Sequence, residues 1–145
     1  MSQKDSLITL IKQHADIERD DAKDINGMRK RTSNSVARLL LLEMELDSAK
    51  HAAILTEMLE TLKGISPGKS LWEHELEDFT GNAIVRKEFE EHAKKEKDVL
   101  AHLEKELEHT KDEGLKLLLQ NIAEDEKKHH RILQAMVRNL YKLEK

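Results

Sequence analysis

The clearest chemical signal in this sequence is a glutamate followed three residues later by a histidine, Glu126 and His129. Side chains at that spacing project from neighbouring turns on one face of a helix. A charged carboxylate among core residues is unfavourable unless a partner or a metal ion neutralises it. The same face carries apolar residues that a helix would bury, namely Leu118, Ile122, Leu133, Met136 and Leu140. The pair therefore predicts either a buried ion pair or two metal ligands.

Other segments also place polar side chains in the middle of an apolar stripe. Stripes with spacings of three and four residues run over about 7–28, 35–63 and 82–109, which is typical of amphipathic helices. Their central polar residues are His14 and Glu18 in the first stripe, His51 in the second, and His92 and Glu96 in the third. These residues join Glu126 and His129 as candidate ligands or candidate buried partners.

The composition predicts an all-α protein made of long helices. The chain has 145 residues, only five glycines and one proline, and 37% charged residues, and a chain of this length is expected to form one domain. The turn at residues 30–35 offers Thr32, Ser33 or Asn34 as the N-cap of the next helix. We therefore expect four helices, the last of which ends near Tyr141.

Charge and cysteine content exclude several kinds of function. A formal net charge of −4 argues against a dedicated nucleic-acid binder. The absence of cysteine excludes disulfides, zinc–thiolate sites and iron–sulfur clusters. No signal peptide is evident and no apolar run is long enough to cross a membrane, so a cytoplasmic protein without a membrane partner is expected.

The chain contains an internal repeat. A shift of 78 residues without gaps aligns His14 with His92, Glu18 with Glu96, and His51 with His129. The same shift aligns apolar pairs such as Leu55 and Leu133. Because polar stripe residues match as well as apolar ones, a biased composition is a poor explanation. We interpret the chain as two duplicated helical hairpins, residues 4–63 and 82–141, joined by a crossover over 64–81.

The spacing of these residues also predicts where they meet. Glu18 lies 14 residues before residue 32 in the first turn, and Ser48 and His51 lie 16 and 19 residues after it. At ~1.5 Å rise per residue, Glu18 and the pair at 48 and 51 face each other across the hairpin. Glu96 faces Glu126 and His129 in the same way. The crossover is long enough to return along a helix, which makes the second and third helices parallel and predicts ferritin-like topology. All candidate ligands would then lie in one layer.

These residues resemble the pattern of the ferritin-like, rubrerythrin-related superfamily. That pattern has one glutamate on each of the first and third helices, and Glu-x-x-His on each of the second and fourth, where an aspartate often precedes the glutamate. The residues of this chain that match it are Glu18, Glu96, Asp47, His51, Asp125, Glu126 and His129. The resemblance implies a ferritin-like four-helix bundle, residues 1–145 in a single domain, that binds metal.

Ser48 departs from the family pattern, because it stands where the glutamate of the second helix belongs. The matched set therefore has three carboxylates and two histidines, one carboxylate fewer than a di-iron site. His14 and His92 are alternative ligands or orient the glutamates, and they are also candidate partners in buried ion pairs. Asp47 and Asp125 are expected to accept hydrogen bonds from His51 and His129. His130 falls outside the stripe and is expected at the surface.

The resemblance implies one or two iron or manganese ions, with zinc as an alternative. Iron would imply chemistry with O₂ or peroxide, and an external electron donor because the chain has no cysteine. The other hypothesis, favoured by Ser48, is a degenerate ferritin-like bundle that dimerises or binds a partner without catalysis. Apolar residues outside the main stripes, such as Leu42, Leu46 and Ile84, predict a homodimer. Whether the chain is an enzyme depends on which hypothesis holds.

Overall fold

The structure is a computed structural model that describes residues 2–66, 68–74 and 82–142, with side chains described only over 2–66, 68–74 and 87–139. Within these ranges the chain is all-α and has no strand, as the composition predicts. The four helices are α1 (Gln3–Arg31), α2 (Ser35–Gly64), α3 (Asn82–Glu108) and α4 (Glu113–Lys142). Each lies within a few residues of its expected position.

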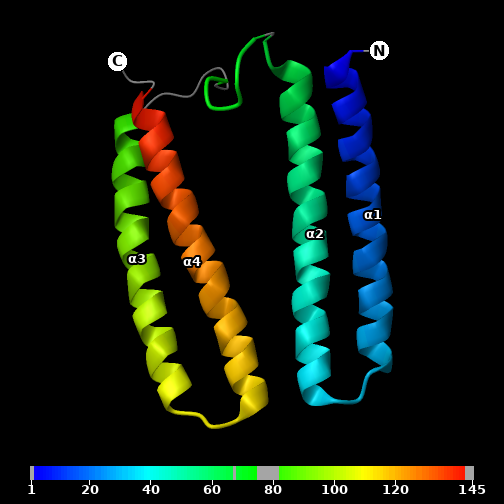
Figure 1. Ribbon diagram of the computed structural model, residues 1–145, viewed down its shortest axis with the longest axis vertical. Coiled ribbons are helices and arrows are strands. Elements are labelled where there is room, and N and C mark those ends of the chain that lie inside the picture. The colour runs from blue at the N-terminus through cyan, green and yellow to red at the C-terminus, as the bar shows by residue number, and fades with distance from the viewer. Residues whose placement is uncertain (1, 67, 75–81, 143–145) are drawn as a thin grey trace. The chain divides into compact units, whose positions relative to one another are not determined.

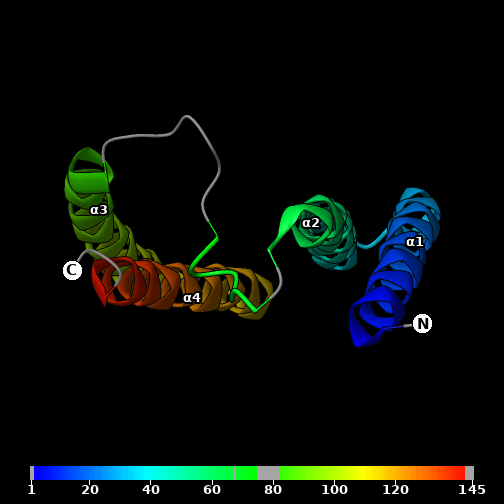
Figure 2. The same cartoon turned by 90° about the horizontal axis from the view of Figure 1, so that it is seen from above.

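The helices form two antiparallel hairpins, α1 with α2 and α3 with α4 (Figures 1 and 2). The chain divides into two compact units between Pro67 and Gly68, so one unit contains α1 and α2 and the other contains α3 and α4. Residues 75–81 of the predicted crossover lie outside the described residues. The single domain and the parallel order of α2 and α3 stay predictions.

Side-chain caps fix where the helices begin. Ser2 and Asp5 form a reciprocal capping box at the start of α1. Asn34, one of the three candidates, is the N-cap of α2, and its side chain accepts a hydrogen bond of 3.0 Å from the Ala37 N–H. Before α4, Asp112 Oδ1 accepts a bond of 2.8 Å from the Leu115 N–H. Each cap satisfies a backbone donor that has no partner inside its helix.

The interior of the first hairpin is apolar and built partly from small residues. Ile11, Ala15, Ala52 and Leu55 are buried there. Methionine and leucine side chains near the end of α2 pack against the cluster of Ile11, Ala15 and Leu55. Small side chains at a helix–helix contact allow the two backbones to approach closely. The first hairpin therefore closes on itself without buried charge among these residues.

The interior of the second hairpin has a different character. Leu103 and Leu133 are buried in it, and so is a carboxylate, Glu96, with 7% of its surface exposed. Glu96 is the only buried charged residue among those whose side chains the structure describes. A buried carboxylate without full compensation is unfavourable for stability alone, so this position is where a function should be sought.

No helix in the described part of the chain combines the length and the apolar character needed to cross a bilayer.

Candidate metal centre

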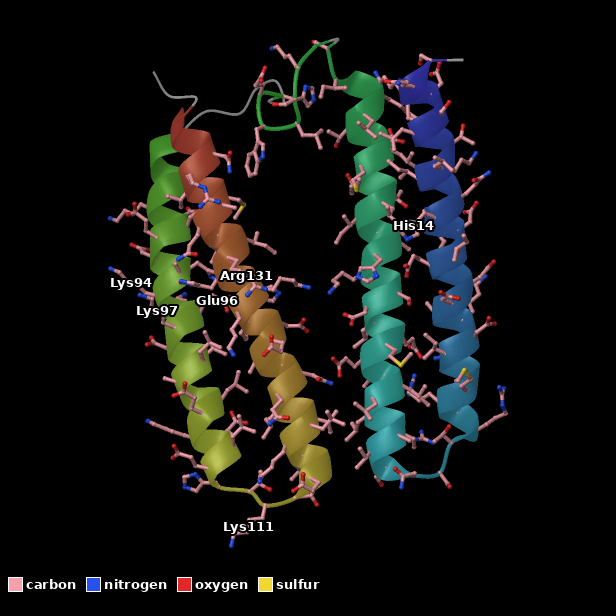
Figure 3. The ribbon with its side chains drawn as sticks, in the orientation of Figure 1. His14, Lys94, Glu96, Lys97, Lys111 and Arg131 are labelled. Atoms are coloured by element: carbon pink, nitrogen blue, oxygen red, sulfur yellow. The ribbon has the colours of Figure 1, made fainter. Side chains whose placement is uncertain are left out.

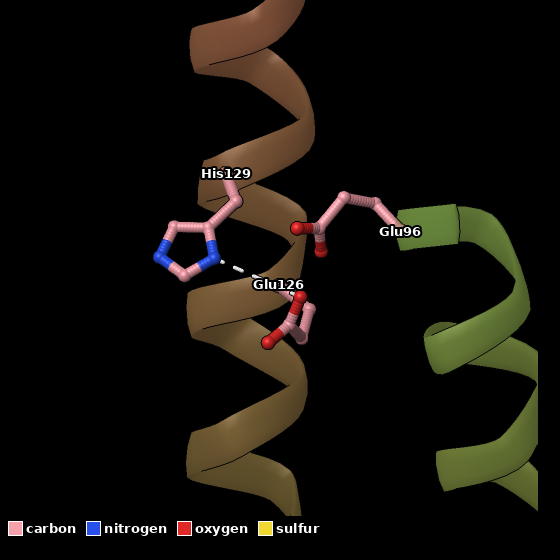
Figure 4. A group of neighbouring side chains, drawn as sticks. All are labelled: Glu96, Glu126 and His129. Carbon is pink, nitrogen blue, oxygen red and sulfur yellow. Dashed lines mark ion pairs between the residues drawn. The ribbon is translucent and has the colours of Figure 1, made fainter. Parts of the chain in front are cut away.

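Three side chains of the second hairpin converge on one point (Figure 4). Glu96 reaches from α3 toward α4, where Glu126 and His129 project from successive turns. One ligand atom of each residue lies within 4.8 Å of the others. The sequence prediction that Glu96 faces Glu126 and His129 across the hairpin is thus confirmed. Among the residues whose side chains are described, no other group of three or more potential ligands is this close.

The position of the cluster follows from helical spacing. Glu126 lies seven residues before the buried Leu133, and Glu96 lies seven residues before the buried Leu103. Seven residues are two turns, so each carboxylate lies on the same face as a leucine that packs between the helices. The apolar contact between α3 and α4 therefore brings the two carboxylates together.

One oxygen of Glu96 is oriented by a histidine. His92, one turn earlier on α3, donates a hydrogen bond of 3.1 Å from Nε2 to Glu96 Oε1. The other oxygen, Oε2, is buried and has no hydrogen-bond partner among the residues that the structure describes. Leaving a buried acceptor unsatisfied costs about 1–3 kcal/mol, and more when it is charged. The bare oxygen marks the place where a proton or a cation would be bound.

The acidities of the two carboxyl groups are coupled. The neighbouring carboxyl group of Glu126 is the largest influence on Glu96, and it holds the pKa of Glu96 below its ordinary value although burial opposes this. The closeness of Glu96, followed by burial and the charge of Glu96, raises the pKa of Glu126. A lowered pKa beside a raised one is the behaviour of two acids close enough to share a proton.

His129 makes its contact within its own helix. Its Nδ1 lies 3.7 Å from Glu126 Oε2, and almost half of the imidazole is exposed. The three residues thus offer two carboxylates and one imidazole, ligand types used by iron, manganese and zinc. The bare Glu96 oxygen beside two further donors fits a divalent cation, which would replace the shared proton.

The first hairpin contains a related but different arrangement. Glu18 on α1, whose side chain is largely buried, has a histidine at each oxygen. His14 Nε2 lies 3.3 Å from Oε1, and His51 Nδ1 reaches across from α2 to within 3.5 Å of Oε2. The predicted contact between Glu18 and His51 is confirmed. His14 on α1 and Glu96 on α3 are both labelled in Figure 3.

The two aspartates differ from their expected role. Asp47 Oδ1 lies 3.1 Å from Lys50 Nζ, and Asp125 Oδ1 lies 3.8 Å from Lys128 Nζ. In each case the lysine three residues later takes the contact that was expected for the histidine. A lysine three residues after an aspartate lies on a neighbouring turn of the same helix face and carries the opposite charge, which favours this contact.

His130 is placed differently from the prediction of a surface residue. It is half-buried, its Nδ1 is enclosed without a partner, and its Nε2 lies 3.2 Å from Gln134 Nε2. The residue that matches His130 in the repeat is Ala52, which the structure also buries. The apolar stripe of α4 passes through His129, and no sequence signal indicated that the next residue would be partly enclosed.

Comparison of the chain with protein-family models, with curated proteins and with solved structures finds no match.

Proposed function

We propose that this protein binds a divalent metal ion, with Glu96, Glu126 and His129 as its ligands. The observation that carries the proposal is the buried Glu96 carboxylate, which has one oxygen without a hydrogen-bond partner among the described residues and lies in a close group with a second carboxylate and an imidazole. A purely structural ion pair would place a cationic side chain there. A metal ion supplies the missing positive charge and accepts lone pairs from all three residues.

Iron or manganese fits this set best, and zinc is the alternative. Two carboxylates and one imidazole combine hard oxygen donors with a borderline nitrogen donor. Bound iron or manganese would supply redox chemistry with O₂ or peroxide, and an external donor would have to deliver electrons because the chain has no cysteine. His92 would keep Glu96 oriented, since its hydrogen bond to Oε1 holds one oxygen of the carboxylate in place.

We further propose that the two hairpins pack as a ferritin-like four-helix bundle. Support comes from exposed apolar residues at equivalent positions of the repeat, flanking His51 on α2 and His129 on α4. Their exposed fractions are 52% for Met44 and 47% for its equivalent Ile122, and 51% for Ile54 and 47% for its equivalent Ile132. Burying such a side chain contributes about 1.5–3 kcal/mol. Packing of these faces would place Glu18 and His51 in the layer of the metal ligands.

The same apolar faces support a second candidate, a module that pairs with a second copy of the chain. Sedimentation and thermal melting of the wild-type protein and of a double variant, Ile54→Ser with Ile132→Ser, distinguish packing within one chain from pairing of two chains. Intramolecular packing predicts a monomer whose melting temperature falls in the variant and does not depend on concentration. A dimer that dissociates in the variant would favour the second candidate.

Metal binding is tested by reconstitution. Purified protein is treated with a chelator and then exchanged into buffer that contains Mn(II), Zn(II) or, under anaerobic conditions, Fe(II). Its metal content is then measured by mass spectrometry. We expect bound metal and a higher melting temperature, since a ligand at 100 times its Kd stabilises the folded state by about 2.7 kcal/mol.

The matched variants are His129→Ala and His102→Ala. His102 is a largely exposed histidine of α3 whose nearest ion-pair partner is Glu106. We expect metal binding to be lost in His129→Ala and kept in His102→Ala. Wild-type protein that binds none of the three metals and melts at an unchanged temperature would refute the proposed function.

A further inference from the structure

The two hairpins have a histidine and a glutamate at equivalent positions, but the contacts of the two glutamate carboxylates differ. In each hairpin a histidine one turn before the glutamate contacts Oε1, at 3.3 Å for His14 and Glu18 and at 3.1 Å for His92 and Glu96. The second oxygen differs. Glu18 Oε2 has His51 Nδ1 at 3.5 Å, whereas Glu96 Oε2 has no donor.

The residue that causes this difference is Ser48, which matches Glu126 in the repeat. In the second hairpin His129 is turned to the Glu126 carboxylate of its own helix, at 3.7 Å. In the first hairpin no carboxylate stands at the matching position, so His51 contacts the glutamate across the hairpin. The serine in place of glutamate thus distinguishes the first hairpin, where His51 contacts Glu18 across α1 and α2, from the second, where His129 contacts Glu126 on its own helix.

We propose that the protein binds a single metal ion on the second hairpin, and that Glu18 is held by His14 and His51 and is not a metal ligand. This inference rests on the proposed function and limits it to one ion. At the matching positions the first hairpin has Glu18 and two histidines, and among the described residues these do not form a close group of ligand atoms as those of the second hairpin do. Binding an ion there would also require breaking the contact between His51 and Glu18.

A single ion held by three protein ligands leaves coordination positions for water or a small molecule. Sites with three protein ligands and one open position are typical of catalytic metals, whereas structural zinc sites use four protein ligands. The exposed part of the His129 imidazole indicates that solvent reaches this side of the cluster. The inferred site is therefore an open, mononuclear one.

The test counts ions in the full-length protein. Chelator-treated protein is titrated with Mn(II) while electron paramagnetic resonance measures the free ion, and circular dichroism confirms helix content in every variant. We expect one ion per chain. Glu96→Gln should weaken binding by roughly 100-fold or more, whereas the matched Glu18→Gln should change Kd by less than about threefold because it lies outside the site.

A third variant, Ser48→Glu, should restore the missing ligand and raise the count to two ions. The inference is overturned if wild-type protein binds two ions, if Glu18→Gln weakens binding as strongly as Glu96→Gln, or if Ser48→Glu still binds one. These outcomes leave the proposed metal binding intact. Absence of any bound Mn(II), Fe(II) or Zn(II) in the wild type would instead refute both proposals.

Discussion

Replacing Glu126 by glutamine should stabilise the metal-free protein and abolish metal binding. Glutamine has nearly the same shape as glutamate, carries no charge, and has an amide that donates hydrogen bonds. In the variant this amide would donate to the bare Oε2 of Glu96. A substitution that improves stability and removes a function identifies a residue kept for that function.

The size of the effect follows from the geometry. Two carboxylate charges 4.8 Å apart, the upper limit for the ligand atoms here, repel each other by about 3.5 kcal/mol at an effective dielectric constant of about 20. His129 and the solvent that reaches Glu126, whose side chain is 20% exposed, offset part of this repulsion. Supplying a donor to a buried acceptor contributes about 1–3 kcal/mol. We expect a net gain of about 1–3 kcal/mol near neutral pH, or roughly 3–4 °C in Tm for each kcal/mol.

The gain should depend on pH with a definite sign. The raised pKa of Glu126 means that its protonated form stabilises the fold below the ordinary value of 4.5, and that this contribution is lost as pH rises through the folded-state pKa. The lowered pKa of Glu96 means that its ionised form contributes above 4.5 and is lost as pH falls through its own folded-state pKa. Near pH 4.5 the wild type therefore has the shared proton that glutamine mimics.

Thermal unfolding with a chelator present, at about pH 4.5 and about pH 7.5, measures the difference between wild type and Glu126→Gln. We expect little difference at the lower pH and the full gain at the higher pH. Glu124→Gln is the matched control, because Glu124 lies on α4, is largely exposed and has Lys127 as its ion-pair partner. The reasoning fails if Glu126→Gln lowers the melting temperature at pH 7.5 or changes it equally at both pH values.

Three further predictions concern the scaffold. Asn34→Ala should reduce the free energy of unfolding by about 1 kcal/mol, because it removes the α2 N-cap; chemical denaturation measures this, and Ser33→Ala should have no comparable effect. Leu133→Ala should destabilise the protein by about 2–5 kcal/mol, whereas Leu117→Ala, at an exposed position of α4, should stay within about 0.5 kcal/mol. Arg29 Nε lies 3.2 Å from Glu45 Oε1; although burial of Glu45 opposes it, the hydrogen bonds from Arg29 and Asn26 keep its pKa lowered. Without Arg29 the pKa of Glu45 should rise toward its ordinary value, so Arg29→Gln should lose less stability than the wild type when the pH falls below 4.5. Equal acid unfolding of variant and wild type would contradict this.

Helical periodicity and the internal repeat were sufficient to predict the helices and the pairing within each hairpin. Both signals report local geometry, since a stripe and a turn decide which face of α3 meets which face of α4. They therefore placed Glu96 opposite Glu126 and His129, and Glu18 opposite His51. What they predicted depends only on helical rise and spacing.

Finer choices between neighbouring groups were not predictable from spacing. Lys50 and His51 are both within reach of Asp47, and their charges decide the contact. From the sequence, His51 could contact either Asp47 or Glu18. It contacts Glu18 because Ser48 places no carboxylate beside it on α2. Such competitions depend on side-chain conformation, which periodicity does not encode.

His130 shows a limit of the apolar stripe as a predictor. The apolar pattern of α4 passes through His129, and on that basis the next residue belongs to the surface. The structure instead encloses part of His130, and it also buries Ala52, the matching residue of the first hairpin. The half-buried imidazole also places a larger side chain in the second hairpin where the first has a methyl group.

The confinement of Glu96, Glu126 and His129 to one hairpin has a consequence for folding kinetics. All three residues lie between Glu96 and His129 and belong to two consecutive helices, so no contact with α1 or α2 is needed to bring them together. Contacts between neighbouring helices have low contact order and form early, because little chain entropy is lost in closing a short loop. The cluster should therefore assemble as soon as α3 pairs with α4, and an ion present during folding could bind before the rest of the chain is ordered.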